Sequence, residues 1–225
     1  MLKSKKLVII GDSAFAEVAY QYFQFDSEYE VVAFSVEKEF LTRQTLFDLP
    51  VISFENLEEF YNPLETYFYA ALVYTKLNRL RTRLYLEAKK RGYAPASYIS
   101  SRAFIWSNVE IGEHVFIFED NTIQPYVKIG SNCVLWSGNH IGHHSFVMNN
   151  CFIASHAVVS GFCTIGENSF IGVNSTIANN VDVGRDNWIG LGVTIAKSTT
   201  NNVLYKGPRS EVASISALDF FRVEK

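Results

Sequence analysis

Aliphatic residues recur at every sixth position between residues 99 and 200, without a single insertion. The period starts at Ile99 and ends at Ile195, and all seventeen positions are Ile, Leu or Val. A helix would repeat its apolar residues every 3.6 positions, and a half-buried strand every 2. A fixed period of six is instead typical of a hexapeptide β-helix, in which each six forms a short strand and a turn. We therefore expect three sixes to make one triangular coil, and the stack to hold between five and six coils.

Two other positions of each six also favour particular residue types. Small residues often stand four positions after the aliphatic, and glycine often follows it directly, as in Ile141-Gly142. We expect the aliphatic to point into the prism, the small residue to ease the corner, and the glycine to supply unusual dihedrals. The small-residue position also holds all three cysteines, namely Cys133, Cys151 and Cys163. This placement predicts buried, unbridged thiols, with residues 18 apart stacked on neighbouring coils.

Before the repeat, strand-like and helix-like segments alternate. Residues 6–10, 29–34 and 67–74 have the apolar runs of buried strands, and residues 14–23 and 77–91 have helical periodicity. Strands that alternate with helices indicate a parallel α/β sheet. We divide the chain into a half-Rossmann-like α/β domain at 1–98, a parallel β-helix at 99–200 and a C-terminal tail at 201–225.

The first strand is followed by a turn at Gly11, Ser13 and Ala14 that opens a helix, the position of a dinucleotide fingerprint. Two of the three fingerprint glycines are missing, and the acidic residue expected at the end of the next strand is replaced by Ser35 and Val36, with Glu37 beyond. This disfavours NAD. The helix N-terminus can still offer N–H groups to a phosphate, so a nucleotide-linked ligand and a purely structural role both stay open.

Composition excludes several partners. The net charge of −3 gives no basic footprint for nucleic acid, and no apolar stretch is long enough for a membrane span. The apolar run after Lys6 is too short for a signal peptide, so we expect a cytoplasmic protein. The basic residues of the 77–91 helix, among them Arg79, Arg81 and Arg83, are interpreted as a solvated face and not as phosphate ligands.

All five histidines lie in the repeat, and three of them, His140, His143 and His144, fall within seven residues. Imidazole suits proton transfer near neutral pH, because its ordinary pKa is ~6.5. The spacing of His140 and His143 does not converge on a metal as it would on a helix, so no metal is expected. Catalysis is the favoured interpretation of the cluster, with a structural surface role as its rival.

The chain resembles the NeuD/PglD-type sugar acyltransferases over nearly its whole length. The resemblance includes the first strand and turn at 7–17, the Leu49-Pro50-Val51 segment, the repeat, and the end at 206–209. It implies a left-handed coil and transfer of an acyl group, usually acetyl from acetyl-CoA, to an amine or hydroxyl of a sugar. That sugar is commonly nucleotide-linked and destined for surface polysaccharide or glycoprotein.

The resemblance also implies roles for individual residues. Alignment with the family places His143 on the general base and His144 on the position of an acidic partner, so Glu119, Asp120 and Glu167 are the open candidates for orienting His143. Strand alternation is expected to turn the side chains of His143 and His144 in different directions. Acetyl-CoA is expected at Gly161, Gly190, Gly192, Lys206 and Pro208, and the nucleotide of the sugar at Gly11, Ser13 and Ala14.

The exterior of the repeat carries aromatic residues outside the inward set, at Trp106, Phe118, Trp136, Phe146 and Phe152. A monomer rarely leaves such a surface in water, and the resemblance implies three-fold assembly, so we expect a homotrimer. The competing hypothesis is a non-catalytic trimeric β-helix scaffold that binds a sugar nucleotide or a protein partner.

Overall fold

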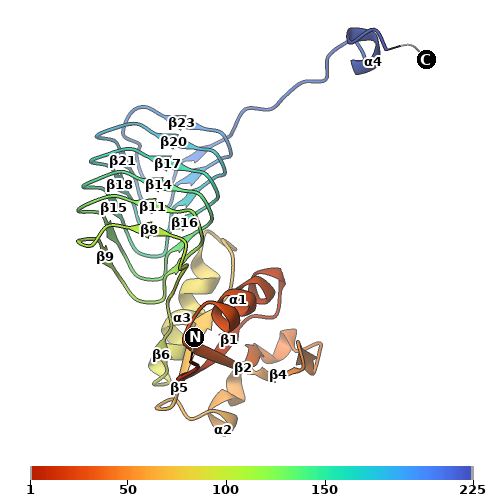
Figure 1. Ribbon diagram of the computed structural model, residues 1–225, viewed down its shortest axis with the longest axis vertical. Helices are drawn as coiled ribbons and strands as arrows, with labels where there is room; N and C mark the ends of the chain where they lie inside the picture. Colours follow the sequence, from red (N-terminus) through yellow and green to blue (C-terminus); the bar gives the residue numbers. More distant parts are fainter. Residues whose placement is uncertain (1, 224–225) are drawn as a thin grey trace.

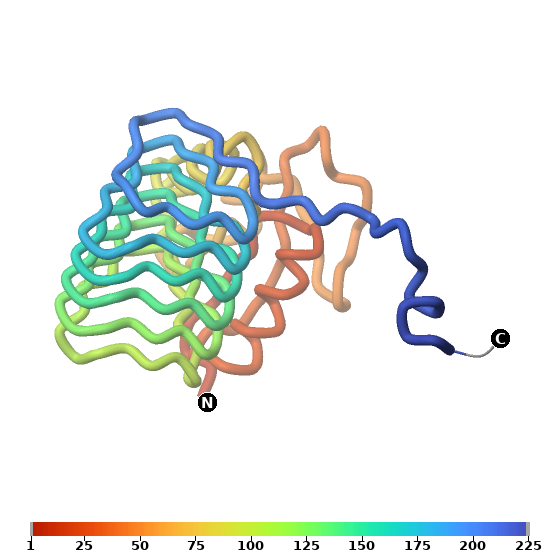
Figure 2. Tube along the Cα trace, turned by 90° about the horizontal axis from the view of Figure 1, so that it is seen from above, coloured from red at the N-terminus to blue at the C-terminus, as the bar shows by residue number. Residues whose placement is uncertain are grey.

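The computed structural model describes residues 2–223, and in it the chain forms two parts joined end to end (Figure 1). An α/β part made by the N-terminal residues lies at the bottom of Figure 1, and a stack of coils rises above it. After the last coil the chain runs away from both parts and ends in the short helix α4 (Ala217–Phe220) (Figure 2). None of the helices described is long and apolar enough to cross a membrane.

The α/β part is built on a six-stranded sheet in the order β3-β4-β2-β1-β5-β6, which is parallel except for the edge strand β3. Its strands are β1 (Lys5–Ile10), β2 (Tyr29–Val36), β3 (Thr45–Leu46), β4 (Leu49–Ser53), β5 (Thr66–Ala70) and β6 (Ala94–Pro95). Its helices are α1 (Ala14–Phe25), α2 (Leu57–Phe60) and α3 (Arg79–Lys90), with 3-10 turns η1 (Lys38–Phe40) and η2 (Phe54–Asn56).

The two faces of strand β1 are covered by different helices. Leu7 and Ile9 pack with Phe15 and Phe23 of α1, whereas the next residues along the strand, Val8 and Ile10, pack with Leu84 and Ala88 of α3. Because successive strand residues point to opposite faces, a strand buried on both sides reads as a continuous apolar run. The predicted alternation of strands and helices is confirmed.

Seventeen two-residue strands, from β7 to β23, form the three walls of the coil stack. The first wall consists of β7 (Tyr98–Ile99), β10 (Phe116–Ile117), β13 (Val134–Leu135), β16 (Phe152–Ile153), β19 (Phe170–Ile171) and β22 (Trp188–Ile189), and is extended by β24 (Leu204–Tyr205). The second wall consists of β8 (Phe104–Ile105), β11 (Thr122–Ile123), β14 (His140–Ile141), β17 (Val158–Val159), β20 (Thr176–Ile177) and β23 (Thr194–Ile195). The third wall consists of β9 (Glu110–Ile111), β12 (Lys128–Ile129), β15 (Phe146–Val147), β18 (Thr164–Ile165) and β21 (Asp182–Val183).

Each of these strands ends on one of the predicted aliphatic residues, and neighbouring coils pair in parallel with residues 18 apart, as Ile141 pairs with Val159. The stack is a left-handed parallel β-helix, as expected. Its core holds the aliphatic residues from Ile117 onward together with Cys133, Cys151 and Cys163, which are buried and unbridged, whereas Ile99 in the first strand of the stack is 42% exposed. The predicted packing role of the thiols is confirmed.

The glycines that follow the aliphatics do not serve the dihedral role expected of them. In the sixes that begin at Ile111 through Ile189, the residue with positive φ is the third after the aliphatic, and it is most often asparagine, for example Asn150 at φ 62°. A Cβ added to Gly142 would instead lie 2.5 Å from the carbonyl carbon of Ser160, and one added to Gly166 would lie 2.4 Å from the amide nitrogen of Arg185. These glycines let neighbouring coils approach closely.

The α/β part covers the first wall with a cluster of aromatic rings. Phe15 of α1 lies 5.7 Å from Phe116 and 6.3 Å from Phe118, measured between ring centroids. Phe118 and Phe152 are consequently only 1% and 2% exposed. The expectation that these two residues lie on an outer face in need of a partner subunit was wrong, because helix α1 and the segment after β5 of the same chain cover them.

Arg81 joins the two parts from inside. The interpretation of a solvated basic face was wrong for this residue, which is fully buried, while Arg79 pairs with Asp186 of the coils and Arg83 with Glu37. The Arg81 guanidinium donates to the carbonyl oxygens of Leu72 and Val73 on its own side, and to those of Asn132 and Cys151 in the coils. A buried cation is tolerated when hydrogen bonds replace its hydration.

His114 lies beside this junction and is held neutral. Its Nε2 accepts a hydrogen bond from the backbone N–H of Ala70 at 2.8 Å, and its Nδ1 lies 2.9 Å from Asn132 Oδ1, so the proton is on Nδ1. A second proton would have to bind to Nε2, where it would face the N–H of Ala70 and abolish the hydrogen bond between them. Burial, with the charge of Arg81, lowers the pKa of His114 to about 3.

This depressed pKa makes stability depend on pH. An unfolded histidine has a pKa of ~6.5, so the contribution of His114 is fully present above that pH and falls by about 1.4 kcal/mol per unit as the pH drops toward 3. We expect urea unfolding at pH 7.5 and pH 5 to show this loss in the wild type and a smaller loss in His114→Gln. Equal losses in the two proteins would contradict the assignment.

Candidate active site

His143 and His144 lie together in an exposed turn between β14 of the second wall and β15 of the third wall. The His143 N–H donates to Gln124 Oε1 at 2.9 Å, and the His144 N–H donates to the Pro125 carbonyl oxygen at 3.1 Å. Both acceptors belong to the preceding coil. The turn is therefore fixed by hydrogen bonds to the coil below it, while its two imidazole rings stay accessible to solvent.

The two rings contact each other, contrary to the expected divergence of their side chains. Their Nδ1 atoms lie 3.2 Å apart, a hydrogen-bond distance that requires one nitrogen to carry a proton and the other to accept it. Strand alternation does not apply here, because both residues belong to the turn and His144 has a positive φ of 58°. The structure thus places the two histidines in one site.

Gly161 lies directly above His143 on the next coil. A Cβ at Gly161 would sit 2.8 Å from Cε1 and 3.0 Å from Nε2 of His143, so only glycine leaves the imidazole its present position. The Gly161 N–H donates to Asn179 Oδ1 at 2.9 Å. Gly161, predicted to contact acetyl-CoA, is thus an immediate neighbour of the imidazole and supplies a backbone donor beside it.

The acidic candidates for orienting His143 are engaged at other corners. Glu119 accepts hydrogen bonds from Tyr22 and Ser137, where the first and second walls meet. Glu167 accepts from Asn149, where the third and first walls meet. Asp120 follows Glu119 on the same corner. In the described chain no hydrogen bond joins any of these three candidates to His143, and the partner of its ring is His144.

Three of the residues predicted to bind acetyl-CoA line one cleft of about 390 Å³ at the last coils, namely Gly190, Lys206 and Pro208. Gly192 adjoins it, since a Cβ there would lie 3.6 Å from Pro208 Cγ. Tyr74 and Arg209 also line this cleft and were not anticipated. Tyr74 belongs to residues 71–74, which were predicted as the end of a strand but form a loop after β5. The centroid of its ring lies 4.6 Å from that of Phe170.

A second cleft, of about 230 Å³, lies at the carboxyl ends of β1 and β2 and includes Gly11 and Ser13. Gly11 has φ 121°, and a Cβ there would meet the Ala71 carbonyl oxygen at 3.0 Å, so the position requires glycine. Ala14 begins α1 and is exposed, but it does not line this cleft.

Glu37 is the residue of the second cleft that sequence reasoning passed over. Strand β2 runs two residues beyond its predicted end, to Val36, so Glu37 follows the strand directly and lines the cleft. Both of its carboxylate oxygens accept from Arg83, at 2.9 and 2.7 Å. The sequence did contain the signal, namely an acidic residue near the end of the second strand. It was dismissed because the strand was predicted to end at Phe34, which left Glu37 too far beyond the strand end.

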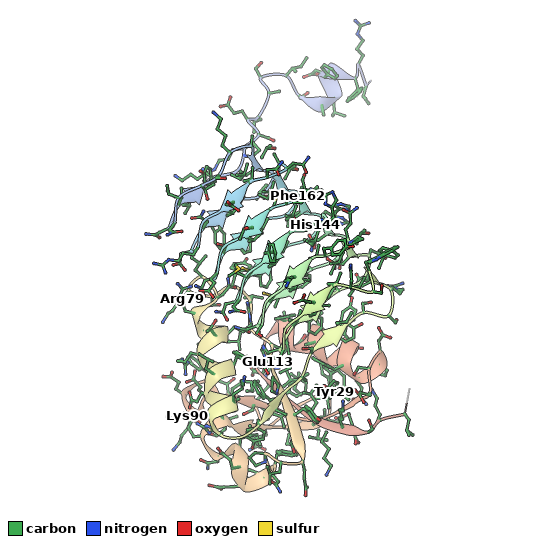
Figure 3. The ribbon with its side chains drawn as sticks, turned by 90° about the vertical axis from the view of Figure 1, so that its left-hand side faces the viewer. Tyr29, Arg79, Lys90, Glu113, His144 and Phe162 are labelled. Carbon is green, nitrogen blue, oxygen red and sulfur yellow. The ribbon has the colours of Figure 1, made fainter. Side chains whose placement is uncertain are left out.

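The His143–His144 turn and the second cleft face different sides of the chain. The turn lies on the corner between the second and third walls, the corner that does not border the first wall, whereas the α/β part packs on the first wall. Figure 3 shows His144 and Phe162 along one edge of the stack and Arg79, where α3 meets the coils, along the opposite edge. Among the residues described, no group of three His, Cys, Asp or Glu side chains could hold a metal ion.

Comparison with known proteins identifies the repeat in part of the coil stack. Residues 108–143 and 144–179 each match the family model described as bacterial transferase hexapeptide (six repeats). No curated protein sequence matches the chain.

Similar solved structures cover both parts of the chain. A histidine-to-asparagine variant of perosamine N-acetyltransferase from Caulobacter crescentus, in complex with CoA and GDP-perosamine, is 21% identical with a TM-score of 0.81, over 92% of this chain and 96% of that one. The acetyltransferase domain of PglB from Neisseria gonorrhoeae, with acetyl coenzyme A, is 20% identical with a TM-score of 0.70, over 91% and 97%. WeeI from Acinetobacter baumannii is 19% identical with a TM-score of 0.53, over 91% and 97%. The chain thus carries hexapeptide repeats over residues 108–179 and shares the two-part fold of these solved structures.

Proposed function

We propose that this chain transfers an acetyl group from acetyl-CoA to the amine of a nucleotide-linked sugar. The observation that carries the proposal is the exposed imidazole of His143, which lies beneath Gly161 of the next coil and whose Nδ1 is within hydrogen-bond distance of His144. An imidazole fixed at one nitrogen and accessible at the other is arranged for general-base catalysis. The ligands of the similar Caulobacter enzyme, CoA and GDP-perosamine, support an amine over a hydroxyl as the acceptor.

The reaction requires one base and one oxyanion contact. The amine attacks the thioester carbonyl and must lose a proton as the C–N bond forms; we assign that proton to His143 Nε2. It then passes to the departing thiolate, so the products are the amide and CoA. The Gly161 N–H, which Asn179 Oδ1 occupies in the free protein, is the donor we assign to the developing oxyanion. No acyl-enzyme is needed, in keeping with the burial of all three thiols.

The two clefts are assigned to the two substrates. The cleft at Gly190, Lys206 and Pro208 combines cationic side chains with apolar walls, as a pantetheine arm and phosphates require. The cleft at Gly11 and Ser13 places the N-terminus of α1 beside an apolar floor, which suits a nucleotide and its phosphates. We propose the cytoplasm as the compartment, consistent with the free thiols.

A homotrimer would bring these separated elements together. In one chain the nucleotide cleft lies on the side of the first wall, and His143 lies on the corner farthest from it. The walls that the α/β part leaves uncovered expose apolar side chains, including Trp106 at 48% and Phe146 at 40%. We propose that neighbouring copies bury these residues and place the sugar bound by one copy against His143 of the next.

Replacing His143 tests the base. A general base contributes ~10²–10⁴-fold, so His143→Asn should lower turnover by about that factor with little change in CoA affinity. The assay is thiol release from acetyl-CoA with a panel of nucleotide-linked amino sugars. His156→Asn, which alters an exposed histidine on a different corner, is the matched control and should retain activity. A wild type that binds sugar nucleotides without releasing thiol would favour the scaffold hypothesis instead.

Gly161→Ala tests the geometry around the base. The added methyl would overlap His143 Cε1, so the imidazole must move while the fold, with an ordinary φ at Gly161, should be retained. We expect turnover to fall about tenfold or more with an unchanged melting temperature. Full activity in this variant would show that the present position of His143 is not the one used in catalysis.

Light scattering tests the assembly. We expect a particle of three times the 25.5 kDa of one chain at micromolar concentration, because the apolar residues on the uncovered walls favour association. A stable monomer under those conditions would remove the proposed route by which the sugar reaches His143.

A further inference from the structure

Three aromatic rings form a continuous stack on the corner that carries the histidine pair. Tyr126, His144 and Phe162 are 18 residues apart and occupy the same position of successive coils. The Tyr126 and His144 rings are stacked with centroids 4.6 Å apart, and the His144 and Phe162 rings with centroids 4.8 Å apart. The His144 imidazole is therefore held between two rings, and the His143 ring meets the edge of Phe162 at 5.0 Å (Figure 3).

The backbone of this stack is unfavourable for its residues. Tyr126 and Phe162 have φ of 64° and 58°, a left-handed conformation that bulky side chains rarely adopt. In other sixes the same position is filled by residues that tolerate it, such as Asn150, Asn168 and Asn180. The two rings are also 58% and 53% exposed, so they contribute little to the core. Strain of this kind, kept at the surface, points to a functional constraint.

The hydrogen bond between the two histidines shows why the position of the His144 ring matters for catalysis. One proton lies between the two Nδ1 atoms. If His143 carries it, His143 Nε2 is free to accept a proton; if His144 carries it, His143 Nε2 must hold its own proton and cannot act as a base. His143 can therefore act as a base only when His144 Nδ1 is the acceptor, and this requires the His144 ring to keep its Nδ1 turned toward His143.

We propose that Tyr126 and Phe162 are positioning residues, which clamp the His144 ring so that its Nδ1 accepts the Nδ1 proton of His143. This inference rests on the proposed function and assigns the neutral His144 the orienting role that the family gives to an acidic residue. The groups packed around the pair are the side chain of Gln124, the carbonyl of Pro125, the two rings and Gly161. The clamp thus holds the acceptor nitrogen beside His143 by stacking, without a carboxylate.

Asparagine substitutions separate positioning from folding. Phe162→Asn and Tyr126→Asn replace a strained aromatic residue by the type that other coils use, so the melting temperature should stay or rise. We expect kcat to fall about tenfold with the KM values for both substrates nearly unchanged. Tyr126→Phe keeps the stack and should keep wild-type kcat. His156→Asn, a change at another left-handed corner position with φ 58°, should leave kcat unchanged.

A spectroscopic measurement tests the tautomer without any substrate. In protein labelled with ¹⁵N-histidine, we expect NMR to show His143 protonated at Nδ1 in the wild type and a mixture of tautomers in Phe162→Asn. Identical tautomers in both proteins would overturn the proposal, as would a higher KM with unchanged kcat, which would make Phe162 a binding residue. If the wild type transfers no acetyl group, the proposed function fails, and the NMR result still decides the clamp.

Discussion

Each residue of the coil stack lies against the residue eighteen positions later, and most features of this protein depend on that constraint. Parallel pairing in exact register, as between His140 and Val158, leaves no freedom to shift one coil against the next. Where two coils come closest, only glycine fits, because a Cβ on one coil would meet the backbone of the next, as at Gly142. The same spacing places Gly161 above His143 and builds the stack of Tyr126, His144 and Phe162.

The α/β part adds a second constraint, because it is joined to the coils by contacts that bury both charge and aromatic surface. Arg81 donates to carbonyl oxygens on both sides of the junction, and His114 links β5 to the coils while remaining neutral. Losing either partner would leave buried polar groups unpaired, which costs more than the hydrogen bonds themselves contribute. The junction therefore fixes the direction in which the cleft at Gly11 and Ser13 faces, relative to the walls of the coil stack.

These two constraints explain why the chemistry of the proposed reaction is divided. The coil stack positions an imidazole pair and a backbone donor on one corner, and the α/β part positions the cleft that we propose for the nucleotide on the opposite side. In the proposed homotrimer, a neighbouring copy covers the exposed walls and brings its cleft next to His143. The one assembly thus accounts both for the apolar walls exposed in a single chain and for the incomplete site.

The amino-acid sequence determined the local pattern. The period of six fixed the coil, the inward aliphatics and the buried thiols, because each six repeats the same backbone and sends equivalent side chains the same way. It also located the strand–turn–helix at Gly11 and the histidine cluster. Only the tertiary structure decided which of the equivalent outer residues are covered, so that Phe118 is buried and Phe146 is not. It also decided that Arg81 is a buried link and that His143 and His144 touch, since those outcomes depend on turns and on contacts between residues far apart in the chain, which no local period encodes.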